Sequence, residues 1–174
     1  MSAGALISTP LIWILALVAL QRLGELVLSQ RNTRQLLAQG GREVGAGHYP
    51  AMIALHASWL VAIAVTTPLY RQPNWALIAV FGAMQLTRLW VVAALGTYWT
   101  TRVITVDTAP LVRTGPFRFL RHPNYWVVAV EVAVLPLAFG AWPVALIWSV
   151  LNAAMLFHRI RIEDAALAPR AELG

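Results

Sequence analysis

The sequence predicts an all-α integral membrane protein with five transmembrane helices, a C-terminal helical hairpin and a short cytoplasmic C-terminal helix. Two observations lead to this fold class. Of the 174 residues, 59% are hydrophobic and only 11% are charged, whereas soluble domains contain about 25% charged residues. The apolar residues also form five blocks without a polar face, which is typical of helices that face lipid. We expect residues 1–174 to form a single membrane domain.

The first three predicted spans satisfy the requirement of about 20 mostly apolar residues for a bilayer crossing. They cover residues 10–28, 49–70 and 75–96. Arg22 and Glu25 mark the far end of the first block, which is therefore expected to leave the membrane there. Gln85 and Arg88 lie inside the third block, so this span carries polar groups into the membrane.

The last two predicted spans are shorter and form a hairpin. They cover residues 123–140 and 143–157. Gly140 and Pro143 lie at the junction, and because Gly and Pro punctuate helices, the chain should turn tightly there. Pro136 should bend the first helix of the hairpin.

Arginine supplies all 13 basic residues, and it is distributed unevenly between the two predicted sides of the membrane. The loops at 29–48 and 97–122 and the C-terminal tail share one side, where ten arginines lie, whereas the other side holds Arg71. The positive-inside rule places the arginine-rich side, and with it the active site, in the cytoplasm. Because the Lys-free, Ala- and Arg-rich composition is typical of a GC-rich bacterial genome, we expect the inner membrane of a bacterial cell.

Several functional classes are excluded or disfavoured. The arginines are scattered between apolar blocks, so membrane lipids rather than nucleic acid are the expected partners. The absence of cysteine excludes disulfides and thiolate metal sites. No His-Glu-x-x-His occurs and His56 is expected to be a packing residue, so no metal site is predicted. Gly45 and Gly47 form a Gly-x-Gly without a preceding strand or a third glycine, so they predict no dinucleotide fold.

Polar residues gather in two predicted cytoplasmic segments, at about 102–125 and 158–167. Because a hairpin returns the chain to the side it left, the two segments should meet at one membrane face. Pro123 suits the first turn of a helix. Three polar residues then lie at the mouth of that helix: His122, Asn124 and Tyr125. Free backbone N–H groups at this position favour an anionic group of a ligand.

The second segment contains two pairs of opposite charges at helical spacing. Arg159 and Glu163 are four residues apart and share one face, and Arg161 and Asp164 are three apart and share another. They are either ion pairs at the membrane edge, each worth about 0–1 kcal/mol, or part of a binding site. The spacing alone does not decide between these interpretations.

The order of these motifs resembles the isoprenylcysteine carboxyl methyltransferase family over about residues 102–167. The resemblance rests on Gly115-Pro116-Phe117-Arg118, Arg121-His122-Pro123-Asn124-Tyr125, a helical hairpin, and Arg159-x-Arg161-x-Glu163-Asp164-x-x-Leu167. An earlier set is similar to a bacterial branch that accompanies type III polyketide synthases and O-methylates alkylpyrones or alkylresorcinols. That set is Arg31-Asn32, Gly40-Gly41, Glu43 and His48-Tyr49-Pro50.

The resemblance implies that S-adenosylmethionine binds at the cytoplasmic face. The implied cofactor-binding residues are Pro110, Leu111, Val112, Phe117, His122, Pro123, Asn124, Tyr125 and Glu163. Arg159 matches the substrate-side arginine of the family, and Arg159 and Glu163 are the implied catalytic residues. Two positions depart from the family pattern, because Phe117 replaces a frequent Tyr and Asp164 replaces the second Glu.

The residues suit such a reaction, because methyl transfer mainly requires a positioned donor and the exclusion of water. The Arg159 fork could hold an anionic oxygen nucleophile, and Glu163 could orient Arg159 or hold the ammonium group of the cofactor. We therefore expect O-methylation of a lipophilic acid, either an alkylpyrone or alkylresorcinol or an isoprenylcysteine carboxylate. A soluble type III polyketide synthase is a candidate partner. The alternatives are a phospholipid N-methyltransferase-like enzyme, a sterol-type reductase, or a non-catalytic membrane partner of a soluble synthase.

Arg88 and Glu131 lie inside predicted spans, where charges are costly and usually pair. With a rise of about 1.5 Å per residue, both lie roughly 10–12 Å below the cytoplasmic face. We therefore expect them to be partners, with Glu25 as the competing partner of Arg88. The pair is either structural or forms part of the substrate-binding site at the inner end of an acceptor cavity.

Overall fold

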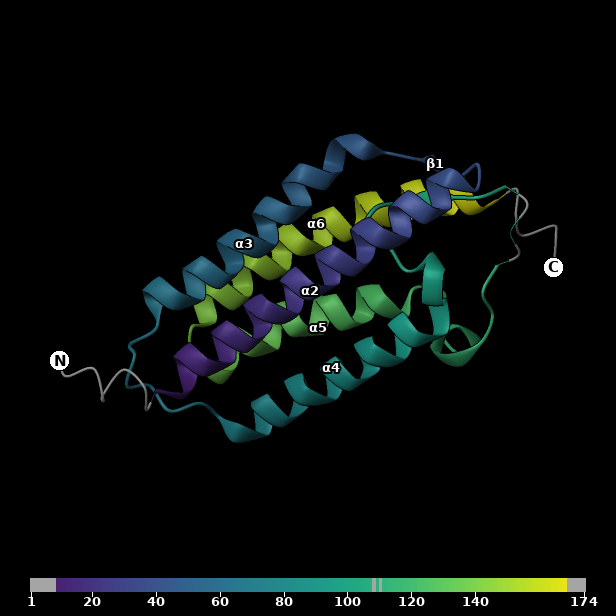
Figure 1. Cartoon of the computed structure of the whole chain (residues 1–174). Helices are drawn as coiled ribbons and strands as arrows, with labels where there is room; N and C mark the ends of the chain where they lie inside the picture. Colours follow the sequence, from purple (N-terminus) through teal and green to yellow (C-terminus); the bar gives the residue numbers. More distant parts are fainter. Residues whose placement is uncertain (1–8, 108, 110, 169–174) are drawn as a thin grey trace.

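The computed structural model describes residues 9–107, 109 and 111–168, and it is mostly helical (Figure 1). Within these residues, five long helices form the body of the molecule. They are α2 (Pro10–Ala38), α3 (Tyr49–Thr66), α4 (Trp75–Leu95), α5 (Pro123–Ala138) and α6 (Trp142–Leu167). The shorter elements are β1 (Arg42–Glu43), η1 (Ala46–His48), η2 (Gly96–Tyr98), β2 (Ile104–Thr105) and η3 (Gly115–Arg118).

The helices confirm the expected all-α membrane fold. In the described part of the chain, four helical stretches are long and apolar enough to cross a bilayer: α2, η1 with α3, α4 with η2, and α6. Helix α5 is also apolar, but its 16 residues make it shorter, at about 24 Å. Many large apolar side chains on these helices are exposed, as lipid-facing surfaces require.

The α2–α3 and α4–α5 connections lie at one end of the bundle. Figure 1 shows that α2, α4 and α6 end there and that α5 begins there. The two strands pair antiparallel, with Arg42 opposite Thr105 and Glu43 opposite Ile104. We call this end, formed by residues 39–48, 96–107, 109, 111–122 and the last turns of α6, the basic end.

Three helix ends differ from the prediction. Helix α2 continues past residue 28 to Ala38, because its charged residues do not interrupt the helix, and it ends just before Gly40, which has a φ of 83°. Helix α3 stops at Thr66, where Thr67 is extended because a residue before proline avoids helical angles. Helix α6 runs without a break to Leu167, so the expected separate C-terminal helix is its last part.

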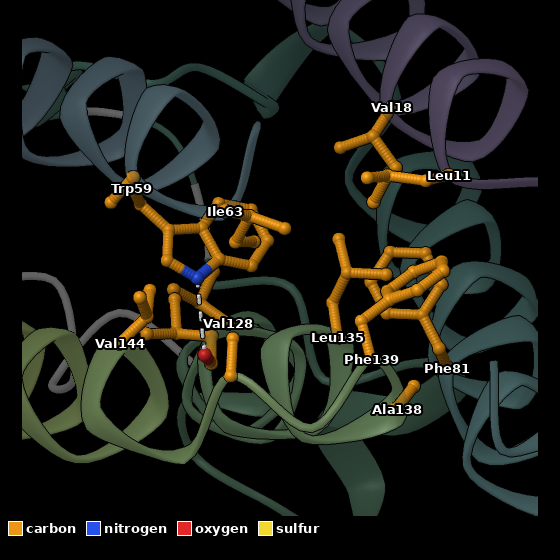
Figure 2. Close-up of a cluster of buried hydrophobic side chains, with 13 residues drawn as sticks. Leu11, Val18, Trp59, Ile63, Phe81, Val128, Leu135, Ala138, Phe139 and Val144 are labelled. Atoms are coloured by element: carbon orange, nitrogen blue, oxygen red, sulfur yellow. Dashed lines mark hydrogen bonds between the residues drawn. The ribbon is translucent and has the colours of Figure 1, made fainter. Parts of the chain in front are cut away.

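The core is built around Trp59 of α3, which packs between α5 and α6 (Figure 2). Pro136 lies inside α5 and has no N–H, so it leaves the carbonyl of Val132, four residues earlier, without its helical donor. The Trp59 indole N–H donates to this carbonyl at 3.1 Å. A side chain of α3 therefore satisfies the backbone group that the proline frees in α5.

Candidate functional site

A cavity of about 580 Å³ opens at the basic end, where α5 begins and α6 ends. Its volume lies in the range of about 300–1,000 Å³ that is usual for small-molecule sites. Three parts of the chain line it: residues between 95 and 104, residues between 111 and 125, and Arg159, Glu163 and Leu167 of α6. The hairpin of α5 and α6 therefore brings the two polar segments together, as the sequence predicts.

The local sequence fixes this wall of the cavity. Pro123 begins α5, so His122 lies just before the helix and Tyr125 in its first turn. Gly115 begins η3 with a φ of 59°, a conformation that favours glycine. A Cβ at this position would lie 3.0 Å from the Cβ of Ala94 and 3.2 Å from the indole nitrogen of Trp90. The close packing of η3 on α4 thus depends on a glycine.

Tyr125 joins the two polar segments through its hydroxyl. The hydroxyl donates to a carboxylate oxygen of Glu163, and it accepts from Nε of Arg159 at 3.3 Å. Arg159 and Glu163 lie one helical turn apart, but a phenol oxygen lies between them instead of a direct ion pair. Three residues from two helices are therefore held in one hydrogen-bonded unit on the cavity wall.

His122 forms a second link between the segments. Its ring stacks on Tyr125 with centroids 5.4 Å apart, and its Nε2 lies 3.0 Å from Oδ1 of Asp164. Arg121 also reaches Asp164, at 3.1 Å. Asp164 thus contacts the residues before α5, whereas Arg161 lies over the ring of Phe157. Glu163 and Asp164 therefore contact residues of the 111–125 segment and not the arginines of their own helix.

Arg159 is 5% exposed, and its guanidinium is fixed from several sides. Besides Tyr125, Nη1 donates to the carbonyl of Thr101 at 2.8 Å and to the sulfur of Met52 at 2.8 Å. Thr101 is itself held by α2, because its N–H donates to Oγ of Ser29 at 2.8 Å. Helices α2 and α3 therefore help to position an arginine of α6.

The structure places most of the predicted site residues on this one cavity. The residues of the prediction that line it are Leu111, Val112, Phe117, His122, Pro123, Asn124, Tyr125, Arg159 and Glu163. Pro110 lies outside the described residues. The lining offers aliphatic and aromatic surface together with one carboxylate, which fits a nucleoside that carries an ammonium group. These residues would hold S-adenosylmethionine if it binds here.

Arg88 and Glu131 pair as expected. Nε of Arg88 donates to Glu131 at 3.1 Å, and a second, shorter hydrogen bond joins Nη2 to the other carboxylate oxygen. Arg22 also donates to Glu131 at 2.6 Å, and Glu25 lies 3.5 Å from Arg88 and 2.9 Å from Arg22. The predicted pair is thus the buried half of a cluster of two arginines and two glutamates, in which Arg22 and Glu25 are partly buried.

This cluster lies beside the cavity and not in its wall. Among the described residues, the lining includes neither Arg88 nor Glu131. One contact connects the two regions, because Nη1 of Arg88 lies 3.5 Å from Oδ1 of Asn124, which does line the cavity. The geometry favours the structural interpretation of the pair, and its substrate-binding role stays a prediction.

One wall of the cavity was not predicted from the sequence. Tyr98, Trp99 and Thr100 follow α4 and line the cavity. They belong to no recognisable motif, and their position depends on Asn32 of α2, whose amide donates to the carbonyl of Trp99 at 2.8 Å. The sequence feature that could have indicated this wall is the pair Tyr98-Trp99 at the end of a membrane helix.

Comparison with known proteins agrees with this geometry. Residues 75–169 match the isoprenylcysteine carboxyl methyltransferase (ICMT) family. The uncharacterized protein YpbQ of Bacillus subtilis (strain 168) is 36% identical over 160 residues, which cover 89% of this chain and 95% of that protein. No solved structure matches the chain. The family match includes every segment that lines the cavity.

Proposed function

Because this chain belongs to the isoprenylcysteine carboxyl methyltransferase family, we propose that it methylates an acidic oxygen of a lipophilic acceptor with S-adenosylmethionine as the donor. The observation that carries the proposal is the cavity at the basic end of a membrane bundle. In this cavity the Tyr125 hydroxyl hydrogen-bonds to both Glu163 and Arg159. Glu163, which suits a cationic group of a ligand, thus lies next to Arg159, which suits an anionic group.

In this proposal the donor lies against the 111–125 segment. Leu111, Val112 and Phe117 supply apolar surface for a nucleoside, and Glu163 holds its ammonium group. The chemistry supplied by bound S-adenosylmethionine is an electrophilic methyl group on a sulfonium. Tyr125 fixes the Glu163 carboxylate through its hydroxyl. The protein thereby contributes position and the exclusion of water more than acid–base chemistry.

Arg159 holds the acceptor in this proposal. Its guanidinium is fixed by Tyr125 and by the Thr101 carbonyl, so little reorganisation is needed when an anionic oxygen binds. The cavity wall contains five arginines and a single carboxylate among its described residues, which favours a carboxylate or enolate over a neutral amine. The membrane helices offer the lipid phase as the source of a long alkyl or prenyl chain.

We propose a polyketide-derived alkylpyrone or alkylresorcinol as the acceptor ahead of an isoprenylcysteine carboxylate. The reason is that Arg31-Asn32 and His48-Tyr49-Pro50 resemble the bacterial branch that accompanies type III polyketide synthases. A soluble type III polyketide synthase is then the proposed partner. The arginine-rich basic end supports an active site that faces the cytoplasm of a bacterial cell.

The test is a methyl-transfer assay with purified protein in detergent micelles and S-adenosylmethionine labelled in the methyl group. The acceptors are an alkylresorcinol, an alkylpyrone, N-acetyl-S-farnesylcysteine and phosphatidylethanolamine. We expect label in at least one acidic acceptor and its loss in the Arg159→Ala variant. Label in phosphatidylethanolamine that persists in Arg159→Ala would replace O-methylation by N-methylation. Failure of S-adenosylhomocysteine to bind would exclude both enzymes.

A further inference from the structure

Among the described residues, the cavity wall contains five arginines and one carboxylate. The five arginines differ in how firmly their side chains are held. Arg113 and Arg118 are exposed and form no ion pair within the described part of the chain. Arg121 is 72% exposed and pairs with Asp164. Arg159 is buried and already donates to three groups. Arg102 combines two properties that these four do not share: it is held by an ion pair with Glu43, and 35% of its side chain is still exposed.

The side chain of Arg102 is anchored on one side. Its Nη1 donates to Glu43 at 2.7 Å, and its guanidinium lies over the ring of Tyr49, 4.1 Å from the centroid. An arginine has five N–H donors, and Glu43 occupies a donor on Nη1. The side chain is 35% exposed, and Arg102 is among the residues that line the cavity.

The backbone of Arg102 is fixed as well. Oγ1 of Thr100 donates to the carbonyl of Arg102 at 2.6 Å. On the other side, the N–H of Val44 donates to the carbonyl of Val103 at 2.9 Å, next to the β1–β2 pair. The neighbouring Thr101 carbonyl binds Arg159. Two arginines of the cavity are therefore positioned by the same short segment.

We propose that Arg102 is a second anion-binding residue of this cavity, which takes a carboxylate or enolate oxygen of a bound ligand. The inference rests on the proposed function, since that function offers two sources of such an oxygen: the amino-acid end of the cofactor and the acidic group of the acceptor. In either case the fork geometry of a fixed guanidinium suits a planar anion. Glu43 and Tyr49 hold Arg102 in place and do not fill the cavity.

The first arm of the test compares Arg102→Gln with Arg42→Gln. Arg42 is a matched control, because it lies on β1, pairs with Asp107 at 3.4 Å and does not line the cavity. The probes are S-adenosylhomocysteine and methylthioadenosine, which lacks the amino-acid end, and calorimetry in micelles measures both. If Arg102 holds the cofactor carboxylate, R102Q should bind S-adenosylhomocysteine about 10- to 100-fold more weakly, the size of a charge-assisted hydrogen bond, and should bind methylthioadenosine as the wild type does.

The second arm uses the acid that the wild type methylates. If Arg102 holds the acceptor, R102Q should leave both nucleoside affinities unchanged and raise the KM of that acid about tenfold or more. A double variant, Arg102→Gln with Glu43→Gln, is measured alongside, because it leaves no unpaired carboxylate if the ion pair is needed for folding. The proposal is overturned if R102Q and the double variant both behave like R42Q in both arms. If the wild type methylates no acid, the proposed acceptor class is wrong, and this outcome is separate from the role of Arg102. In that case the role of Arg102 is overturned if R102Q has the same ratio of S-adenosylhomocysteine to methylthioadenosine affinity as the wild type.

Discussion

At the scale of single residues, Tyr125 connects the two halves of the proposed reaction. Its hydroxyl contacts Glu163, which is proposed to hold the cofactor, and Arg159, which is proposed to hold the acceptor. The stacked ring of His122 and its contact with Asp164 keep the first turn of α5 against the end of α6. One phenol oxygen therefore determines the relative position of two functional groups.

We predict that Tyr125→Phe weakens S-adenosylhomocysteine binding about tenfold, because Glu163 loses a charge-assisted hydrogen bond. The ring remains, so stacking on His122 and the fold should persist. Calorimetry in micelles measures the affinity, and Tyr70→Phe is the control, because Tyr70 is exposed and lies between α3 and α4. Equal affinity in Tyr125→Phe and the control would show that the hydroxyl does not serve the cofactor site.

Arg159 and Glu163 are predicted to have separable roles. Arg159→Ala should lower turnover about 10²–10³-fold, as expected for a positioned charge donor, with S-adenosylhomocysteine affinity largely intact. Glu163→Gln should reduce both turnover and affinity. The control is Arg161→Ala on the same helix, whose guanidinium lies over Phe157 and not in the cavity wall. If Arg159→Ala keeps more than about a tenth of wild-type turnover, its anchoring role is wrong.

At the scale of elements, apolar length predicts where each helix lies but not where each helix ends. The charged residues Arg22 and Glu25 suggested an end for the first helix, yet α2 continues to Ala38 because charged residues are compatible with a helix. The i, i+4 spacing of Arg159 and Glu163 suggested a direct pair. The structure places Tyr125 between them, since a residue from another helix cannot be predicted from spacing along α6.

Helix α5 offers a test of how a neighbouring helix satisfies a proline site. Trp59→Phe should destabilise the protein by about 1–3 kcal/mol, because the buried Val132 carbonyl loses its donor. In a Pro136→Ala background the new backbone N–H can bond to that carbonyl, so the same Trp59→Phe change should cost less. Thermal unfolding in micelles measures the double-mutant cycle, with Trp148→Phe as the control. Additive effects would mean that Trp59 and Pro136 are energetically independent.

At the scale of the whole molecule, the sequence placed the candidate site at the end of the bundle where the cavity lies, but it described only part of the cavity wall. The hairpin argument brings His122 and Glu163 together, because both ends of a hairpin return to one face. The wall that contains Trp99 depends on Asn32, which lies 67 positions earlier in the chain. Such a contact arises from helix packing, and no local pattern in the sequence encodes it.

The largely buried cluster of Arg22, Glu25, Arg88 and Glu131 connects α2, α4 and α5 inside the membrane bundle. Its charges balance, and the side chains of Arg88 and Glu131 are 3% and 1% exposed. Gln85 adds a hydrogen bond to Glu131 at 2.8 Å. A balanced, bonded set of this kind can be stable in a low dielectric, whereas the loss of one member leaves an uncompensated charge.

We therefore predict that Glu131→Gln destabilises the protein by about 3–5 kcal/mol, because the buried Arg88 and the partly buried Arg22 lose their shared carboxylate. A double variant with Arg22→Gln removes one charge of each sign and should recover part of the loss. Thermal unfolding in micelles measures both variants, with Glu25→Gln as a milder comparison. If the cluster is structural, protein that remains folded should keep its acceptor KM and its S-adenosylhomocysteine affinity. An unchanged unfolding midpoint together with a raised acceptor KM would instead place Glu131 in the substrate site.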